Sequence, residues 1–182
     1  MYESDKFTGR YRISSVRAIW HKYDEGVYFV TVCTYNREHY FGKITDGKMY
    51  LTEIGQFADQ QIRNVEMHYP YAAIPLWVVM PNHIHAIVSI DGNKTPQSDL
   101  ETSSRWKTSF VDKQMQFVSH RRGWLSTTIG GLKRAVSRYA HERGIQFAWQ
   151  ARFHDHIIRN NDEMDRIATY IINNVSRWET DR

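Results

Sequence analysis

The spacing of hydrophobic and polar residues predicts mainly strands in the first half of the chain. β-Branched and aromatic residues of 27–34 predict a strand. Residues 51–68 have helical spacing, and Pro70 is expected to end that helix. The apolar runs 74–80 and 83–90 follow, on either side of Pro81-Asn82. They predict two strands or one bent strand.

Turn and capping residues mark further boundaries. Residues 40–44 and 48–51 flank Asp46-Gly47, a dipeptide typical of a tight hairpin turn. Ser126 is a candidate cap for a second helix, and Gly144 is expected to end it. The apolar stripe of that helix consists of Leu125, Ile129, Leu132, Val136 and Tyr139.

The end of the chain predicts one more strand and one more helix. Residues 153–159 are strand-like, and Asn161 is a candidate cap for the last helix. The apolar stripe of this helix consists of Met164, Ile167, Ala168, Ile171 and Val175. The element order indicates an α+β fold, in which helices cover one face of an antiparallel sheet.

The length of 182 residues indicates a single domain over 1–182. Within it, residues 1–26 are expected to form an N-terminal arm, and 91–123 a long polar loop. No apolar stretch approaches the roughly 20 residues of a membrane span. No signal peptide is recognised, and Cys33 is the single cysteine, so a cytoplasmic location is expected.

Positive charge is concentrated in residues 105–159. The whole chain carries a net charge of +4, whereas this segment has eleven Lys and Arg against three acids. Aromatic residues such as Trp106 and Trp124 are interspersed with the basic ones. This combination favours a nucleic-acid surface, although a solvated basic face with core aromatics has the same composition.

Two pairs of histidines have the spacing of metal ligands. His83 and His85 share one face of a predicted strand, about 7 Å apart along it, and two imidazoles at this spacing can bind one metal ion. Ordinary histidines on a half-exposed strand would have the same pattern. His154 and His156 form a rival pair, and spacing alone does not separate the two.

Tyr170 and Asn174 are candidate site residues on the last helix. They are four residues apart, on adjacent turns, at the edge of the apolar stripe. A phenol there is a possible nucleophile, and an amide oxygen one turn away is a possible third metal ligand. A rim tyrosine with a solvated asparagine is the simpler interpretation.

A short motif and three longer blocks of sequence resemble a known family. PNHIH after an apolar strand is the HUH motif, two histidines around one hydrophobic residue. WQARFHDHIIRNNDEMDRIATYIINNVSRW resembles the end of REP-associated tyrosine transposases, which are relatives of the single-tyrosine HUH transposases. GVYFVTVCTYNREHYFGKI and LSTTIGGLKRAVSRY are similar to the same family, and the blocks occur in the family's order.

The resemblance implies a ferredoxin-like or RRM-like sandwich with the HUH motif on a central strand. It implies that His83 and His85 bind a divalent metal, Mg²⁺ or Mn²⁺, and that Asn174 matches the third ligand. Tyr170 would be the catalytic tyrosine, forming a 5′-phosphotyrosine in single-stranded DNA at hairpin-forming palindromic repeats. Many relatives have proline where this chain has Val175.

DNA contacts are expected from basic residues of the second half of the chain. The candidates are Lys133, Arg134, Arg138, Arg121, Arg122, Arg159 and His156. Two other functions remain open from the sequence, namely a domesticated DNA-binding protein without cleavage activity and an HUH nickase of the replication type. The sequence does not distinguish a monomer from a homodimer.

Overall fold

The computed structural model describes residues 6–7, 11–12, 25–94 and 123–178. The strands are β1 (Lys6–Phe7), β2 (Tyr11–Arg12), β3 (Gly26–Cys33), β4 (Gly42–Thr45), β5 (Lys48–Leu51), β6 (Ala72–Met80), β7 (His83–Ile90) and β8 (His154–Ile157). The helices are α1 (Glu53–Arg63), α2 (Val65–His68), α4 (Gly123–Glu142), α5 (Asn161–Ile172) and α6 (Asn174–Arg177), with short 3₁₀ turns at Tyr35–Arg37 and Gly92–Lys94.

A four-stranded antiparallel sheet in the order β6-β7-β3-β8 forms the centre of the fold. The predicted α+β class is therefore confirmed, and the HUH motif lies at the start of β7, one of the two inner strands. Seven of the eight β7 residues are buried, all but Ser89, which is expected of a strand covered on both faces.

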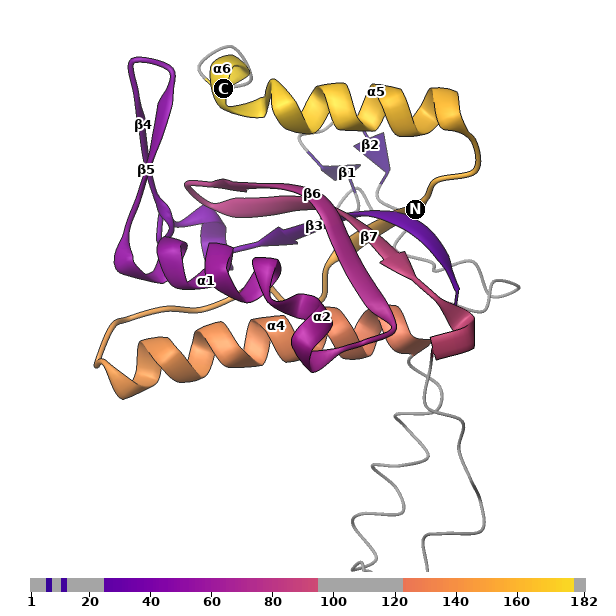
Figure 1. Ribbon diagram of the computed structural model, residues 1–182. Helices are drawn as coiled ribbons and strands as arrows, with labels where there is room; N and C mark the ends of the chain where they lie inside the picture. The colour runs from indigo at the N-terminus through magenta and orange to yellow at the C-terminus, as the bar shows by residue number, and fades with distance from the viewer. Residues whose placement is uncertain (1–5, 8–10, 13–24, 95–122, 179–182) are drawn as a thin grey trace, which may run out of the picture.

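Helices cover both faces of this sheet, which corrects the prediction of helices on one face. α1 and α4 lie on one face, and α5 lies on the other (Figure 1). The larger apolar core joins α1 and α4 to Ile84, Ala86 and Val88 of β7. A smaller core joins Ile171 of α5 to Ile87 from the opposite face of the same strand. The apolar stripe of the last helix was recognised, but its spacing does not say which face of the sheet it covers.

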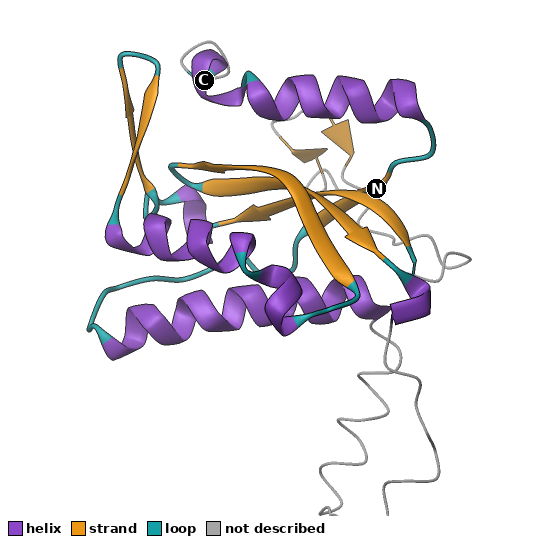
Figure 2. Cartoon of the chain, viewed as in Figure 1, coloured by secondary structure: helices purple, strands orange, loops and turns teal. Residues whose placement is uncertain are grey.

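The β4–β5 hairpin projects from the end of the sheet (Figure 2). Its turn is formed by Asp46 and Gly47, both with positive φ (53° and 67°), as the Asp-Gly dipeptide predicted.

Helix boundaries differ from the predicted ones by a few residues. The helix predicted over 51–68 divides at Asn64 into α1 and α2. α4 begins at Gly123, so Ser126 lies inside it and does not cap it. Gly144, with φ 64°, follows the end of α4 as expected. α5 is capped by Asn160, whose side chain accepts from Glu163 N, and not by the predicted Asn161.

Most of the predicted arm (1–26) and most of the predicted loop (91–123) lie outside the described residues. Among the described residues, no helix has the length and apolar character needed to cross a membrane.

Candidate active site

His83 and His85 lie on the face of β7 that faces α5. Alternate residues of a strand point to opposite faces, so the two histidines share a face with Ile87, while Ile84 and Ala86 point into the larger core. The sequence prediction that the pair shares one face is confirmed. Both side chains are buried, with 7% and 6% of their surface exposed.

Each histidine has a hydrogen-bond partner at Nδ1. The ring centroids are 4.4 Å apart. His83 Nδ1 lies 2.7 Å from Asn82 Oδ1, and His85 Nδ1 lies 2.8 Å from Thr31 Oγ1. Partners at Nδ1 leave the Nε2 atoms as the nitrogens available to a ligand, an arrangement typical of metal-binding histidines.

Burial keeps both imidazoles neutral at ordinary pH. It lowers the pKa of His83 to about 2, with further contributions from His85 and from the positive charge of Arg37. Burial and Arg37 likewise lower the pKa of His85 to about 4. Neutral imidazole is the form that coordinates metal ions.

Tyr170 of α5 lies against the histidine pair. Its Oη is 3.2 Å from His85 Nε2, and the two ring centroids are 5.2 Å apart. Phe29 of β3 contacts both rings, stacking on His85 at 5.2 Å and meeting Tyr170 edge-on at 6.1 Å. Tyr170 remains 37% exposed, so it contacts the histidine pair without being buried.

Asn174 lies just beyond the end of α5, and not on the same helix as Tyr170. The helix ends at Ile172, Asn173 lies between, and Asn174 begins α6. Asn174 is only 6% exposed, and no hydrogen bond of its side-chain amide is found among the described residues. Its role as a third ligand stays a prediction. At the other end of α6, the Trp178 ring lies 6.0 Å from that of His83.

The available donors fit a metal that takes part of its coordination shell from the substrate. His83 and His85 offer two neutral nitrogens, and the buried Asn174 is the amide predicted from the sequence as a third ligand. The described residues contain no group of three or more His, Cys, Asp or Glu placed to hold a metal ion. A closed structural site with four protein ligands therefore has no basis in the described part of the chain.

The rival pair lies on the same face but further along the sheet. His154 and His156 belong to the edge strand β8, and β3 separates them from β7. His156 Nε2 donates to Glu163 Oε1 (2.7 Å), and Glu163 Oε2 accepts from the Arg159 backbone N–H. His156 thus connects β8 to the start of α5, whereas His83 and His85 lie where Tyr170 is held.

Among the described residues, the basic side chains predicted to bind DNA do not gather around Tyr170. Lys133 donates from Nζ to the backbone carbonyls of Gln150 and Arg152, each at 2.8 Å, and so fixes the segment after α4. Arg134 and Arg138 are exposed on α4, in the layer on the far side of the sheet from α5.

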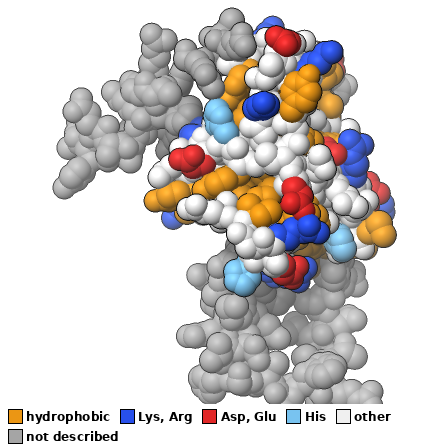
Figure 3. Space-filling view, turned by 90° about the vertical axis from the view of Figure 1, so that its left-hand side faces the viewer, with side chains coloured by type: hydrophobic (Ala, Val, Ile, Leu, Met, Phe, Trp, Pro, Cys, Tyr) orange, Lys and Arg blue, Asp and Glu red, His pale blue; other side chains and the backbone are white. Residues whose placement is uncertain are grey.

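Of the remaining arginine candidates, only Arg159 belongs to the described residues. Arg159 is exposed just after β8, on the approach to α5. Arg121 and Arg122 lie outside the described residues, as does Trp106. On the face shown in Figure 3, Lys and Arg side chains are interspersed with Asp and Glu, so this face carries no continuous basic patch.

Three residues that sequence analysis did not single out contribute to the site: Thr31, Asn82 and Arg37. Thr31 pairs with His85 across β3 and β7, so only the strand register brings it to the histidine. Asn82 is visible in the PNHIH motif itself. Arg37 follows β3 in a left-handed backbone conformation (φ 58°), and its carbonyl accepts from Asn82 Nδ2.

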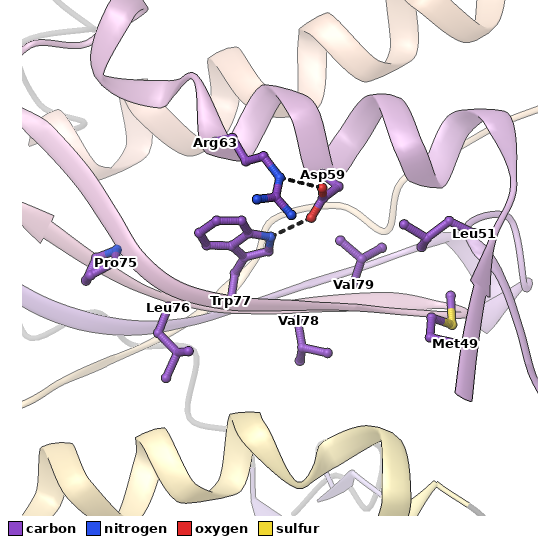
Figure 4. A pocket seen from close by; sticks show the side chains of 9 residues that line it. All are labelled: Met49, Leu51, Asp59, Arg63, Pro75, Leu76, Trp77, Val78 and Val79. Atoms are coloured by element: carbon purple, nitrogen blue, oxygen red, sulfur yellow. Dashed lines mark hydrogen bonds and ion pairs between the residues drawn. The ribbon is translucent and has the colours of Figure 1, made fainter. Parts of the chain in front are cut away.

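A separate groove of about 380 Å³ runs along the free edge of β6. Figure 4 shows Trp77 and Arg63 both turned toward Asp59 of α1, while Leu76 and Val78 point to the opposite side of the strand. Trp77 Nε1 and Arg63 Nε each donate to Asp59 at 2.8 Å. The groove contains none of the predicted site residues, and this cluster joins α1 to the sheet edge.

Comparisons with known proteins place the chain among transposase relatives. An uncharacterized protein of Haemophilus influenzae is 31% identical over 174 residues, which cover 92% of this chain and 91% of that protein. The REP-associated tyrosine transposase of Escherichia coli is 28% identical over 146 residues, or 80% of this chain and 64% of the E. coli protein. No family model matches the chain.

A solved structure has the same fold. It is that of a REP-associated tyrosine transposase bound to a REP hairpin, with a TM-score of 0.50 and 24% sequence identity. The match covers 91% of this chain and 74% of the solved one.

Proposed function

We propose that this chain, which is related in sequence to the REP-associated tyrosine transposase of Escherichia coli, acts as a transposase of that family and cuts and rejoins single-stranded DNA. The nucleophile in this proposal is the hydroxyl of Tyr170, and the metal ligands are His83, His85 and Asn174. The observation that carries the proposal is the 3.2 Å approach of Tyr170 Oη to His85 Nε2. A nucleophile and a candidate metal ligand come from α5 and β7, 85 residues apart, and meet on one face of the sheet.

In the proposed reaction, Tyr170 Oη attacks a phosphodiester phosphorus, a 5′-phosphotyrosine forms and a 3′-hydroxyl leaves. A second 3′-hydroxyl reverses the step, so the bond energy is retained and no nucleotide triphosphate is needed. When bound at the histidines, Mg²⁺ or Mn²⁺ would polarise a non-bridging oxygen of the scissile phosphate.

The protein's own residues supply position and access. Phe29 packs against both Tyr170 and His85, and this limits the movement of the phenol relative to the imidazole. The exposure of Tyr170 allows a DNA strand to reach Oη from solvent. Both histidines are neutral, so neither forms an ion pair with the negatively charged phosphate that would have to be broken during the reaction.

The proposed substrate is a single strand with a hairpin-forming repeat. It is supported by the relative whose solved structure contains a REP hairpin. Arg134, Arg138 and Arg159 are the exposed described candidates for phosphate contacts, and Arg37, whose charge acts on both histidines, lies closer to the reacting groups.

A covalent-trapping experiment tests the proposal. The protein is incubated with end-labelled single strands that carry short inverted repeats, with Mg²⁺ or Mn²⁺, and then boiled in detergent. A labelled protein band attached to the 5′ end of the cut strand is expected. Cleavage without that band would indicate activated water as the nucleophile, and binding without cleavage would indicate a DNA-binding protein that has lost its activity.

A further inference from the structure

Asn82, in the turn between β6 and β7, has a fixed amide orientation. Its Nδ2 lies 3.2 Å from the Arg37 carbonyl oxygen, which can only accept a hydrogen bond. The amide nitrogen must therefore face Arg37, and Oδ1 must face His83 Nδ1 at 2.7 Å. Because Oδ1 carries no hydrogen, the ring proton of neutral His83 has to reside on Nδ1, and Nε2 keeps the lone pair.

The backbone of Asn82 is held just as firmly. Its carbonyl accepts from the backbone N–H of Thr34 at 3.0 Å and from Thr34 Oγ1 at 2.9 Å. Thr34 is fully buried and Asn82 is 9% exposed. Since both ends of the amide and the backbone carbonyl are engaged, Asn82 has little freedom to rotate and release His83.

Thr31 plays the corresponding part for His85. Its Oγ1 lies 2.8 Å from His85 Nδ1, and on the other side of the ring Tyr170 Oη lies 3.2 Å from Nε2. Both partners are hydroxyl groups, but a phenol is the stronger donor. With the phenol donating to Nε2, the His85 proton lies on Nδ1 and Thr31 Oγ1 accepts it.

We propose that Asn82 and Thr31 are positioning residues that hold the ring protons of His83 and His85 on Nδ1, so that both imidazoles present an Nε2 lone pair to the same metal ion. The inference rests on the proposed function for the identity of that ligand, but the proton positions belong to the metal-free protein. Loss of such outer partners typically weakens metal affinity 10- to 100-fold.

The test is the position of the ring protons in the metal-free full-length protein, by long-range ¹H–¹⁵N NMR of its histidines at neutral pH. We expect Nδ1–H for His83 and His85, the reverse of the form that free histidine favours. Thr31→Val, which removes the hydroxyl at nearly constant size, should shift the His85 proton toward Nε2, and Thr31→Ser should restore it. Asn82→Leu should do the same for His83. Asn82 also connects the turn to Arg37, so Asn82→Leu is the variant at risk of not folding. In that case Thr31→Val still tests the inference.

Calorimetric titration with Mn²⁺ gives the second readout. Thr31→Val should bind Mn²⁺ about 10- to 100-fold more weakly than the parent, with recovery in Thr31→Ser. Nε2–H in the parent, or unchanged proton positions and Mn²⁺ affinity in both Thr31→Val and Asn82→Leu, would overturn the inference. A parent that binds no Mn²⁺ would instead overturn the metal centre of the proposed function, and the NMR result would still decide the inference.

Discussion

At the scale of single residues, the proposed reaction depends on the hydroxyl of Tyr170 as its nucleophile. Tyr170→Phe keeps the ring that packs on Phe29 and His85, so it should change the free energy of unfolding by less than about 1 kcal/mol. It should bind hairpin DNA nearly as the parent does but form no covalent protein–DNA product, since phenylalanine has no oxygen to bond to phosphorus. Gel electrophoresis after boiling in detergent measures this.

Tyr139→Phe is the matched control for that variant. The Tyr139 hydroxyl donates to Glu53 Oε1 at 2.8 Å and its ring stacks on Phe57, in the α1–α4 layer away from the histidines. This variant should keep the covalent product. A covalent band that persists in Tyr170→Phe and disappears in Tyr139→Phe would assign the nucleophile to Tyr139 instead.

The two histidine pairs should respond differently to substitution. His83→Ala and His85→Ala each remove an Nε2 from the site beside Tyr170, and metal-dependent cleavage should fall below detection while circular dichroism shows a folded protein. His154→Ala should be milder, because β3 separates His154 from β7. An inactive His154 variant together with an active His83 variant would assign the metal to β8.

The buried histidines also predict how the stability of the metal-free protein depends on pH. Burial chiefly lowers the folded-state pKa of His83 to about 2 and of His85 to about 4, whereas an unfolded histidine titrates near pH 6.5. Below pH 6.5 the unfolded chain therefore binds protons that the folded one does not. The free energy of unfolding should decrease from pH 6.5 toward 4, by up to about 1.4 kcal/mol per pH unit for each histidine.

Urea denaturation at pH 7, 6 and 5 measures this slope, and the double variant His83→Gln/His85→Gln supplies the reference, since all other titrating groups are common to both proteins. The slope of the parent should exceed that of the double variant. Equal slopes would show that the two imidazoles titrate normally in the folded state.

At the scale of elements, the two neighbouring glycines of α4 lie in different surroundings. A Cβ added to Gly131 would lie 1.6 Å from Tyr69 Oη, whereas one added to Gly130 meets nothing within 4 Å. Gly130→Ala should stabilise the protein by up to about 1 kcal/mol through helix propensity. Gly131→Ala should destabilise it, because the Tyr69 ring has to move. Thermal unfolding distinguishes the two signs, and two shifts of the same sign would contradict the close packing of Tyr69 on α4.

The elements also differ in how far the sequence predicts them. Alternation along β7 placed His83 and His85 on one face, and the order of strands and helices identified the α+β class, because both follow from local periodicity. The break between α5 and α6 could not be predicted from periodicity, because the apolar stripe continues through Val175 although α5 ends at Ile172. The pairing of Thr31 with His85 depends on strand register, and the face covered by α5 depends on tertiary packing, so neither is encoded in a local pattern.

At the scale of the whole molecule, the sheet separates the proposed reaction centre from part of the basic surface. Tyr170 and the histidines lie on the α5 side, while Arg134 and Arg138 lie on α4 in the opposite layer (Figure 1). A DNA that contacts both must pass around an edge of the sheet. Within the described residues, Arg159 after the edge strand β8 is exposed near the start of α5, which makes that edge the proposed path.

This geometry leads to a prediction about salt. Each lost phosphate contact to a single strand reduces the slope of log K against log salt by roughly 0.7. If α4 contacts the DNA, Arg134→Gln/Arg138→Gln should flatten the slope by roughly 1.4. It should leave the covalent product intact at saturating DNA, because neither side chain lies in the Tyr170 layer.

Lys133 is left unchanged in this experiment, since its ammonium fixes the backbone at Gln150 and Arg152, and its loss would affect folding as well as DNA binding. Arg159→Gln, on the α5 side, is the comparison. A slope that changes in Arg159→Gln but not in the α4 double variant would confine the DNA to the face of the sheet that carries Tyr170, and α4 would then have no part in DNA binding.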